Sequence, residues 1–325
     1  MGNAAGKSRT ASTILMVQPV DFGFNEQTGI DNEFQTRLSL AGDEINRRAL
    51  AEFQGMVDTL RSYDVSVLVL GPSAQSGEKA PDAVFPNNWL STEHDGTLLT
   101  YPMKAPNRRV EVRLDDVKLL LEQNGYVVGR SLRVGKSDED TFFLEGTGSL
   151  VIDHLNRTVY AALSDRCDPD QFANFLKLRS YHQGILFETR SSTGRPIYHT
   201  NVMMSLGEDF AVICLECLPL SEQKQQVLAT LSATYSEIIE ISLEQVEQHF
   251  CGNILAIRNQ RDQRLVVMSQ RAFAGFSPDQ LRRLRAHAEV VSVRIDTIEA
   301  IGGGSARCMM AEVYSPKVSA RPGIG

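Results

Sequence analysis

The sequence predicts an α/β protein built from five similar units, each with strands and one helix. Four stretches of the chain share one hairpin pattern at a regular spacing, and a helical pattern follows each hairpin. The two ends of the chain supply a fifth unit. Five such units can bury their strands in a closed ring with the helices outside. An open doubly wound sheet is the competing arrangement, but simple alternation of strand and helix would suit it better.

The front of the chain contains a strand, a long helix and a second strand. "TILMVQPV" from Thr13 and "VSVLVL" from Val65 are short runs rich in β-branched residues, which favour strands. Between them, residues 43–64 have the pattern of a long helix. The run "CMMAEVY" from Cys308 closes this fifth unit at the other end of the chain.

The four hairpins begin at Asn88, Ser149, Asn201 and Asn253. Their starts are about 50–60 residues apart, a spacing typical of internal repeats. Each has a small polar residue, a mostly apolar run, a polar turn and a second apolar run, as in "NVMMSLGEDFAVICL" from Asn201. This pattern predicts a β-hairpin with one buried strand.

A helix is predicted after each hairpin, over 109–125, 167–184, 219–238 and 277–291. Gly125 ends the first of these patterns, and Asp168 followed by Pro169 begins the second with a cap and a first-turn proline. No linker rich in Pro or Ser divides the units. We therefore expect residues 13–325 to form one catalytic domain.

Composition excludes several classes of protein. The chain has 325 residues and a net charge of −7, which gives no electrostatic reason to expect nucleic acid or an anionic membrane as a partner. No apolar run approaches the ~18 residues of a membrane span. Residues 1–12 lack a signal segment and are expected to form a disordered leader. A leader without a signal segment, together with an odd count of five cysteines, favours free thiols and a cytoplasmic location.

Polar residues gather just before and at the first strand of each hairpin, in segments 81–88, 143–149, 198–201, 251–253 and 302–308. If the units are pseudo-equivalent, these segments meet at one end of the ring. The residues brought together there would be Asp82, Asn87, Asn88, Glu145, His199, Asn201 and Cys308.

This set is chemically complete for nucleophilic catalysis. A thiolate at Cys308 could attack, with its pKa lowered by a nearby imidazolium or by N–H groups of the glycine run before it. His199 could protonate a leaving amine and then activate water, and Glu145 could hold the imidazole. Taken singly, a cysteine in such a run is more often a core residue and such a histidine more often a structural one, and the glutamate could be a solvated turn residue. Their occurrence at equivalent points of separate repeats favours the functional interpretation.

The motifs "PDAVFPNN", "LEGTGS", "HTN" and "GGGSARC" resemble those of the guanidine-modifying superfamily, in the same order and over essentially the whole chain. The superfamily comprises arginine deiminases, dimethylarginine hydrolases and amidinotransferases. The resemblance implies a pentein fold, a five-bladed pseudo-symmetric α/β-propeller with the helices outside. "QPVDFGFN", "PDAVFPNNW" and "NRR" are most similar to its citrulline-utilisation hydrolase branch.

The resemblance implies a role for each matching position. Cys308 matches the nucleophile, His199 the general acid and base, and Glu145 the acidic residue beside the histidine. The resemblance also implies that an arginine binds the α-carboxylate of the substrate, and Arg108 matches this position, with its neighbour Arg109 as the alternative. Asp82 matches a polar wall position.

Two departures from the family pattern concern the substrate. Arginine deiminases have aspartates where this chain has Asn88 and Asn201. A carboxylate only accepts hydrogen bonds, whereas an amide donates and accepts. Two amides therefore favour a neutral ureido group over a cationic guanidinium.

The sequence thus predicts a hydrolase that converts L-citrulline to L-ornithine, CO₂ and ammonia through an S-carbamoyl cysteine. The alternatives are an arginine deiminase or dimethylarginine hydrolase, an amidinotransferase, a cysteine protease, and a non-catalytic binding protein on the same fold. Cys214 and Cys217 form an isolated pair without the other ligands that zinc requires. No cofactor and no metal are expected. The only expected partners are a small-molecule substrate and, as an open option, further copies of the chain.

Overall fold

The computed structural model describes residues 8–72, 79–135 and 141–318. The strands of the described residues form five three-stranded sheets that share one pairing pattern. In each sheet the central strand pairs with one antiparallel neighbour, here called the inner strand, and with one parallel neighbour, here called the third strand. In inner, central and third order the strands are β3 (Leu90–Thr92), β4 (Thr97–Thr100) and β5 (Arg130–Arg133); β6 (Leu150–Asp153), β7 (Thr158–Ala162) and β8 (Gln183–Phe187); β9 (Met204–Leu206), β10 (Phe210–Ile213) and β11 (Glu237–Glu240); β12 (Leu255–Arg258), β13 (Arg264–Ser269) and β14 (Glu289–Val293); and β15 (Ala311–Glu312), β1 (Thr13–Val17) and β2 (Ser66–Leu70).

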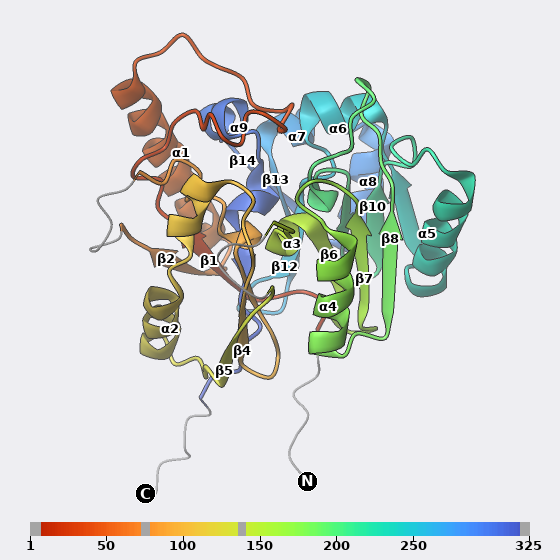
Figure 1. Cartoon of the computed structure of the whole chain (residues 1–325), viewed down its shortest axis with the longest axis horizontal. Coiled ribbons are helices and arrows are strands. Elements are labelled where there is room, and N and C mark those ends of the chain that lie inside the picture. Colours follow the sequence, from red (N-terminus) through yellow and green to blue (C-terminus); the bar gives the residue numbers. More distant parts are fainter. Residues whose placement is uncertain (1–7, 73–78, 136–140, 319–325) are drawn as a thin grey trace, which may run out of the picture.

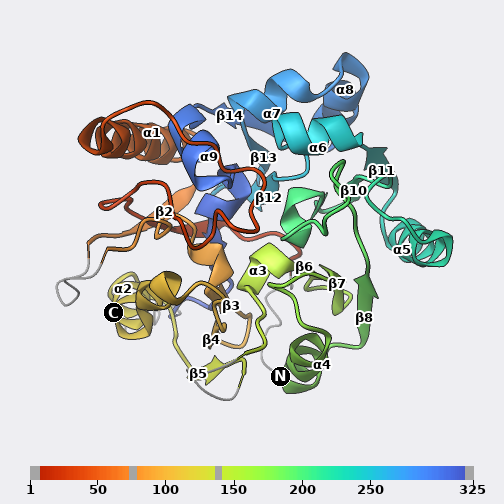
Figure 2. The same cartoon turned by 45° about the horizontal axis from the view of Figure 1, so that its top comes forward.

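A helix connects the central strand of each sheet to the third strand, as a parallel connection requires. These helices lie around the outside of the molecule (Figures 1 and 2). They are α1 (Gly42–Ser62), α2 (Leu114–Gln123), α4 (Pro169–Arg179), α5 (Ser221–Thr234) and α8 (Pro278–His287). Shorter helices are α3 (Gly146–Ser149), α6 (Leu243–His249), α7 (Gln270–Gly275) and α9 (Asp296–Gly302), and the 3-10 turns are η1 (Pro86–Asn88), η2 (Pro106–Glu111), η3 (Thr200–Val202) and η4 (Ala306–Met309).

The inner strands lie against one another: β6 contacts β9, β9 contacts β12, and β15 contacts β3. The predicted α/β class and the repeated units are confirmed. Closure of the five sheets into a complete propeller stays a prediction.

Three predicted helices end earlier than expected. The patterns over 167–184, 219–238 and 277–291 include residues that belong to the third strands β8, β11 and β14. β-branched residues such as Ile238 and Val290 pair there with the central strands, because tertiary pairing outweighs local helical periodicity. The predicted start of α4 is correct, and the Asp168 side chain accepts hydrogen bonds from the backbone N–H groups of Asp170 and Gln171.

Burial of an apolar face anchors each outer helix. The longest, α1, places one face against α9, β2 and β14. Full burial of one large apolar side chain contributes about 1.5–3 kcal/mol. The buried residues of this helix recur at helical spacing and are Ile45, Ala49, Phe53, Met56, Val57 and Leu60.

We predict a disordered leader over residues 1–12. Residues 1–7 of it lie outside the described residues. From Ser8 onward the chain packs on the body: Arg9 Nε lies 3.3 Å from Asp153 Oδ1, and the side chains of Thr10 and Ala11 are buried. Hydrogen bonding and burial of this short segment therefore extend the ordered part in front of β1.

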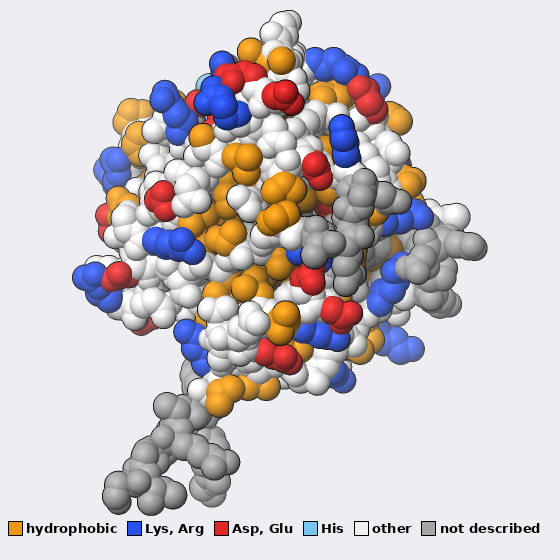
Figure 3. Space-filling view, turned by 90° about the vertical axis from the view of Figure 1, so that its left-hand side faces the viewer, with side chains coloured by type: hydrophobic (Ala, Val, Ile, Leu, Met, Phe, Trp, Pro, Cys, Tyr) orange, Lys and Arg blue, Asp and Glu red, His pale blue; other side chains and the backbone are white. Residues whose placement is uncertain are grey.

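The side of the molecule that carries α1 and α2 mixes charges of both signs with hydrophobic side chains (Figure 3). No helix in the described part of the chain has both the length and the apolar composition that a membrane span needs.

Candidate active site

The polar segments meet as the repeat predicts. The turns η1, α3, η3 and η4 each precede an inner strand. The turn α3 contacts both η1 and η3, and η1 contacts η4. Each turn thus carries its polar side chains to the same end of the sheets. A cavity there is lined by Thr28, Asn32, Asp82, Phe85, Asn88, Arg108, Arg166, Tyr198, His199, Gly302, Gly304 and Cys308.

His199 and Glu145 form a buried pair. His199 Nε2 lies 2.8 Å from Glu145 Oε2, and the other carboxylate oxygen accepts a hydrogen bond from the backbone N–H of Lys104. Arg166 Nη1 lies 3.4 Å from Glu145 Oε2. Burial alone would raise the pKa of Glu145, but the Arg166 charge and the hydrogen bond with His199 hold that pKa well below its usual range. Burial lowers the pKa of His199, and its contact with Glu145 opposes this.

Cys308 is buried against two carboxamides. Asn253 Nδ2 donates to Cys308 Sγ at 3.2 Å, and Asn201 Nδ2 lies 3.6 Å from the same sulfur. Burial raises the pKa of the Cys308 thiol, while the Asn253 hydrogen bond and the charge of Arg307 counteract it. The carboxamides are thus placed to stabilise a thiolate once it forms.

These shifts define the resting site as an ionised glutamate, a neutral imidazole and a protonated thiol. His199 Nε2 is engaged by Glu145, so Nδ1 is the nitrogen that Glu145 does not hold. His199 and Cys308 line one cavity, and a base beside a thiol is the pairing that thiol-dependent hydrolysis requires.

Arg108 lines the cavity, but all its nitrogens are used by the protein. Nε and Nη2 donate to the Glu111 carboxylate, Nη1 donates to Asn88 Oδ1 at 2.9 Å, and Nη2 also reaches the backbone oxygens of Asp82 and Phe85. Binding of a substrate carboxylate by Arg108 stays a prediction, and it would require exchange of these bonds.

Arg109 is not brought to the site. It is exposed, its Nε donates to Met103 O, and it lines a different cavity with Arg133 and Phe143. The reason is geometric, since successive residues of the 3-10 turn η2 point about a third of a turn apart. Arg108 therefore faces inward and its neighbour faces out. The adjacent option of our prediction is wrong in this structure.

Asn88, a lining residue of the cavity, has a buried hydrogen-bond donor without a partner among the described residues. Asn88 Oδ1 must face Arg108, because a guanidinium can only donate. This fixes the orientation of the amide and leaves the buried Nδ2 without a partner among the described residues. Gly148 makes room for this group: a Cβ there would lie 2.4 Å from Asn88 Nδ2 and 2.9 Å from His199 Cε1.

Asp82, another lining residue, has a buried acceptor without a partner in the described part of the chain. Asp82 Oδ2 accepts from Asn25 Nδ2 at 2.7 Å and from Thr28 Oγ1 at 3.1 Å. Its Oδ1 is buried and has no hydrogen-bond partner in the described ranges. Asn201, by contrast, is not a lining residue, because it lies against the sulfur.

A segment from the front of the chain covers the cavity. Thr28 and Asn32 line it, and Asp31 forms an ion pair with Arg166. The space left between these residues is about 10 Å³, roughly the 10–15 Å³ that one water needs. An amino-acid substrate therefore enters only if this cover moves.

The glycines at 302–304 allow both a sharp turn and close packing against a neighbouring segment. Gly303 has a φ of +64° and ends α9, a conformation that favours glycine. A Cβ at Gly302 would lie 2.7 Å from the Phe85 ring. The run thus lets η4 and η1 approach closely enough for Cys308 and Asn88 to share one cavity.

Sequence reasoning missed two residues of this site. Asn253 opens the fourth hairpin as Asn88 and Asn201 open the first and third, so the repeat itself carried a signal for its position. Arg166 lies in the turn between β7 and α4, where no motif marked it.

A family model described as N,N dimethylarginine dimethylhydrolase, eukaryotic, matches residues 18–315. No curated protein sequence matches. The fold resembles that of several solved structures.

The N-terminal domain of ArgZ, an arginine dihydrolase from the cyanobacterial ornithine-ammonia cycle, bound to substrate, has a TM-score of 0.71 at 16% identity, covering 94% of this chain and 98% of that one. AgrE with L-arginine has a TM-score of 0.70 at 17% identity, covering 94% of this chain and 41% of that one. The Pseudomonas aeruginosa dimethylarginine dimethylaminohydrolase (DDAH) complexed with citrulline has a TM-score of 0.63 at 14% identity, covering 94% of this chain and 100% of that one.

Proposed function

Because the chain belongs to the N,N-dimethylarginine dimethylhydrolase family, and is thus a C–N hydrolase of the guanidine-modifying pentein superfamily, we propose that it hydrolyses a ureido amino acid. The substrate that suits the site best is L-citrulline, and the products are L-ornithine, CO₂ and ammonia.

The unpaired donor of Asn88 is the observation that carries this proposal. A ureido group has a carbonyl oxygen that accepts hydrogen bonds and N–H groups that donate them. Asn88 Nδ2 suits the first and Asp82 Oδ1 suits the second. A guanidinium has no acceptor, so it would leave the Asn88 donor buried and unpaired, at a cost of about 1–3 kcal/mol.

The mechanism follows from the positions of the side chains. The thiolate of Cys308 attacks the ureido carbon, and the Asn88 donor stabilises the oxygen as it becomes negative. His199 gives the thiol proton to the leaving nitrogen of ornithine, which breaks the C–N bond and leaves an S-carbamoyl cysteine. Water activated by His199 then cleaves the C–S bond and releases carbamate, which decomposes to CO₂ and ammonia.

The test is product analysis with citrulline, arginine and asymmetric dimethylarginine as separate substrates. Ornithine from citrulline supports the proposal. Citrulline formed from arginine, with no turnover of citrulline itself, contradicts it. Cys308→Ala should abolish turnover of every substrate while the thermal unfolding profile is retained.

Asn88→Asp tests the specificity argument. It replaces the free donor by an acceptor and keeps an oxygen facing Arg108. We expect kcat/KM for citrulline to fall by about 10–100-fold, the equivalent of a 1–3 kcal/mol loss, and kcat/KM for arginine to be retained or to rise. The matched control is Asn124→Asp, the same change at an exposed position in the α2 C-cap. An equal fall for both substrates would contradict the argument.

Arginine or a methylated arginine is the second candidate, and two observations favour it. The Asp82 carboxylate lies on the cavity wall, where a cation would be attracted. Burial also raises the pKa of the Cys308 thiol, and a guanidinium held beside the sulfur would oppose that rise. In this case the same product analysis yields citrulline, or citrulline followed by ornithine.

A further inference from the structure

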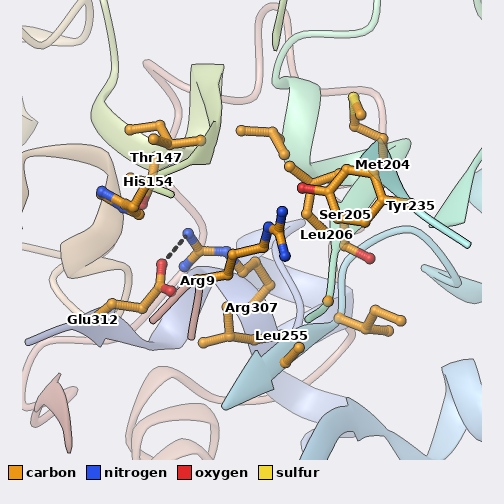
Figure 4. Close-up of a pocket in the computed structure, with 15 residues that line it drawn as sticks. Arg9, Thr147, His154, Met204, Ser205, Leu206, Tyr235, Leu255, Arg307 and Glu312 are labelled. Carbon is orange, nitrogen blue, oxygen red and sulfur yellow. Dashed lines mark hydrogen bonds and ion pairs between the residues drawn. The ribbon is translucent and has the colours of Figure 1, made fainter. Parts of the chain in front are cut away.

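A second cavity lies among the inner strands of the sheets. Its volume is about 40 Å³, and it shares no lining residue with the cavity that holds Cys308. Residues of the inner strands β6, β9 and β12 form much of its wall. Figure 4 shows the side chains of Arg9 and Arg307 in the middle of this space, with Glu312 on one side and Ser205 on the other.

The charged groups of the lining are two arginines and one glutamate. Arg9 pairs with Asp153, and Arg307 Nη2 lies 3.0 Å from Glu312 Oε2. Burial lowers the pKa of His154, which also lines the cavity, to about 4, so this imidazole is neutral at physiological pH. Each guanidinium is thus matched by one carboxylate, and attraction of an anion depends on the N–H groups that these two ion pairs leave free.

Several donors in the cavity are not used by the protein. The hydrogen bonds of Arg9 use Nε and Nη1, and those of Arg307 use Nη1 and Nη2. This leaves Arg9 Nη2 and Arg307 Nε without acceptors in the described part of the chain. Ser205 is 7% exposed, and its Oγ has no partner among the described residues.

We propose that this cavity binds a small inorganic anion of the size of chloride. Two guanidinium groups and a hydroxyl supply N–H and O–H donors from different elements, as an anion requires. One water needs roughly 10–15 Å³ of such space, so 40 Å³ accommodates one small ion with little else and excludes an amino acid or a nucleotide.

The anion site is coupled to the nucleophile through η4. Arg307 faces this cavity, and the next residue, Cys308, faces the other one. The positive charge of Arg307 counteracts the rise in the Cys308 thiol pKa. An anion bound to Arg307 offsets that charge, so occupancy raises the thiol pKa and makes the nucleophile less reactive at a given pH.

Binding is tested with bromide as the probe on the full chain. Crystals soaked in sodium bromide should give an anomalous peak within hydrogen-bond distance of Arg9 and Arg307. In solution, exchange of gluconate for chloride at constant ionic strength should raise the unfolding midpoint in a saturable manner. Both effects should disappear in Arg9→Gln and persist in Arg294→Gln, a matched change at an exposed arginine paired with Asp296.

The coupling is tested by titrating the Cys308 thiol spectroscopically against the Cys308→Ala protein, with and without chloride. We expect chloride to shift the midpoint upward in the wild type and not in Arg9→Gln. A cavity that holds only water, or a bromide peak that survives Arg9→Gln, overturns the proposal, and an unchanged midpoint overturns the coupling. Neither readout requires a substrate, so failure here is distinguishable from failure of the proposed function.

Discussion

Asn253→Ala should raise the pKa of the Cys308 thiol and slow the enzyme at neutral pH. Asn253 Nδ2 donates to Sγ at 3.2 Å and is the shorter of the two carboxamide contacts to the sulfur, the Asn201 contact being 3.6 Å. A hydrogen bond to a charged group contributes about 1.5–3 kcal/mol. Sulfur is a weak acceptor, so we take the lower end. At 1.36 kcal/mol per pKa unit, the expected rise is about one unit.

Because the thiol is mostly protonated at rest, a rise of about one unit reduces the thiolate population, and with it the turnover at fixed pH, by roughly tenfold. The assay is the pH dependence of kcat/KM together with a thiolate absorbance titration against Cys308→Ala. Recovery of turnover at higher pH separates this effect from general damage to the fold. Asn201→Ala, which removes the longer contact, should produce a smaller shift in the same direction.

An unshifted pH profile in Asn253→Ala, with turnover lowered equally at every pH, would refute this reasoning. The side chain would then act only through its second hydrogen bond, which Nδ2 donates to Asn201 O at 3.0 Å.

Three further predictions follow from other contacts. Glu145→Gln leaves His199 without its charged partner, and kcat should fall by about 10²–10⁴-fold; single-turnover kinetics should show that the slow step is cleavage of the C–N bond. His154 is buried with its pKa lowered to about 4 from 6.5. Because the pKa is lower in the folded state, the free energy of unfolding is highest above pH 6.5 and falls by about 3 kcal/mol as pH drops toward 4. Urea unfolding across this pH range should show the fall in the wild type and not in His154→Phe. Arg108→Met breaks a fully buried ion pair and should lower the free energy of unfolding by about 3–5 kcal/mol, whereas Arg109→Ala at an exposed position should change it by less than about 0.5 kcal/mol.

The sequence was sufficient to predict that the candidate catalytic side chains lie together, because they stand at equivalent points of a repeat. Glu145, His199 and Cys308 stand in turns before inner strands, and hairpin periodicity alone indicates that such turns meet. Asn253 stands at the same point and could have been found in the same way. The short hairpins also located most of the strands, since alternation of apolar runs and turns is a local signal.

Contacts between side chains from separate turns were not predictable. Arg166 reaches Glu145 and Asp31 from a turn that carries no motif, and the covering segment meets the cavity only through tertiary packing. The environment of Arg108 was missed for a related reason. Its partner Glu111 is three residues away, but the contacts with Asn88 and with the backbone of Phe85 depend on how η2 folds against η1. Such charge networks are decided by three-dimensional proximity, which one sequence does not display.

The tight fit of the closed chamber around Cys308 bears on which molecule can accept the group carried by the sulfur. With the cover in place, the space beside the sulfur is about 10 Å³, enough for one solvent molecule and too small for a second amino acid. If the cover closes again once the amino-acid product has left, water reaches the group carried by the sulfur and an acceptor amine does not. Closure of the cover then favours hydrolysis over group transfer, and an amidinotransferase on this scaffold would need a wider covered space.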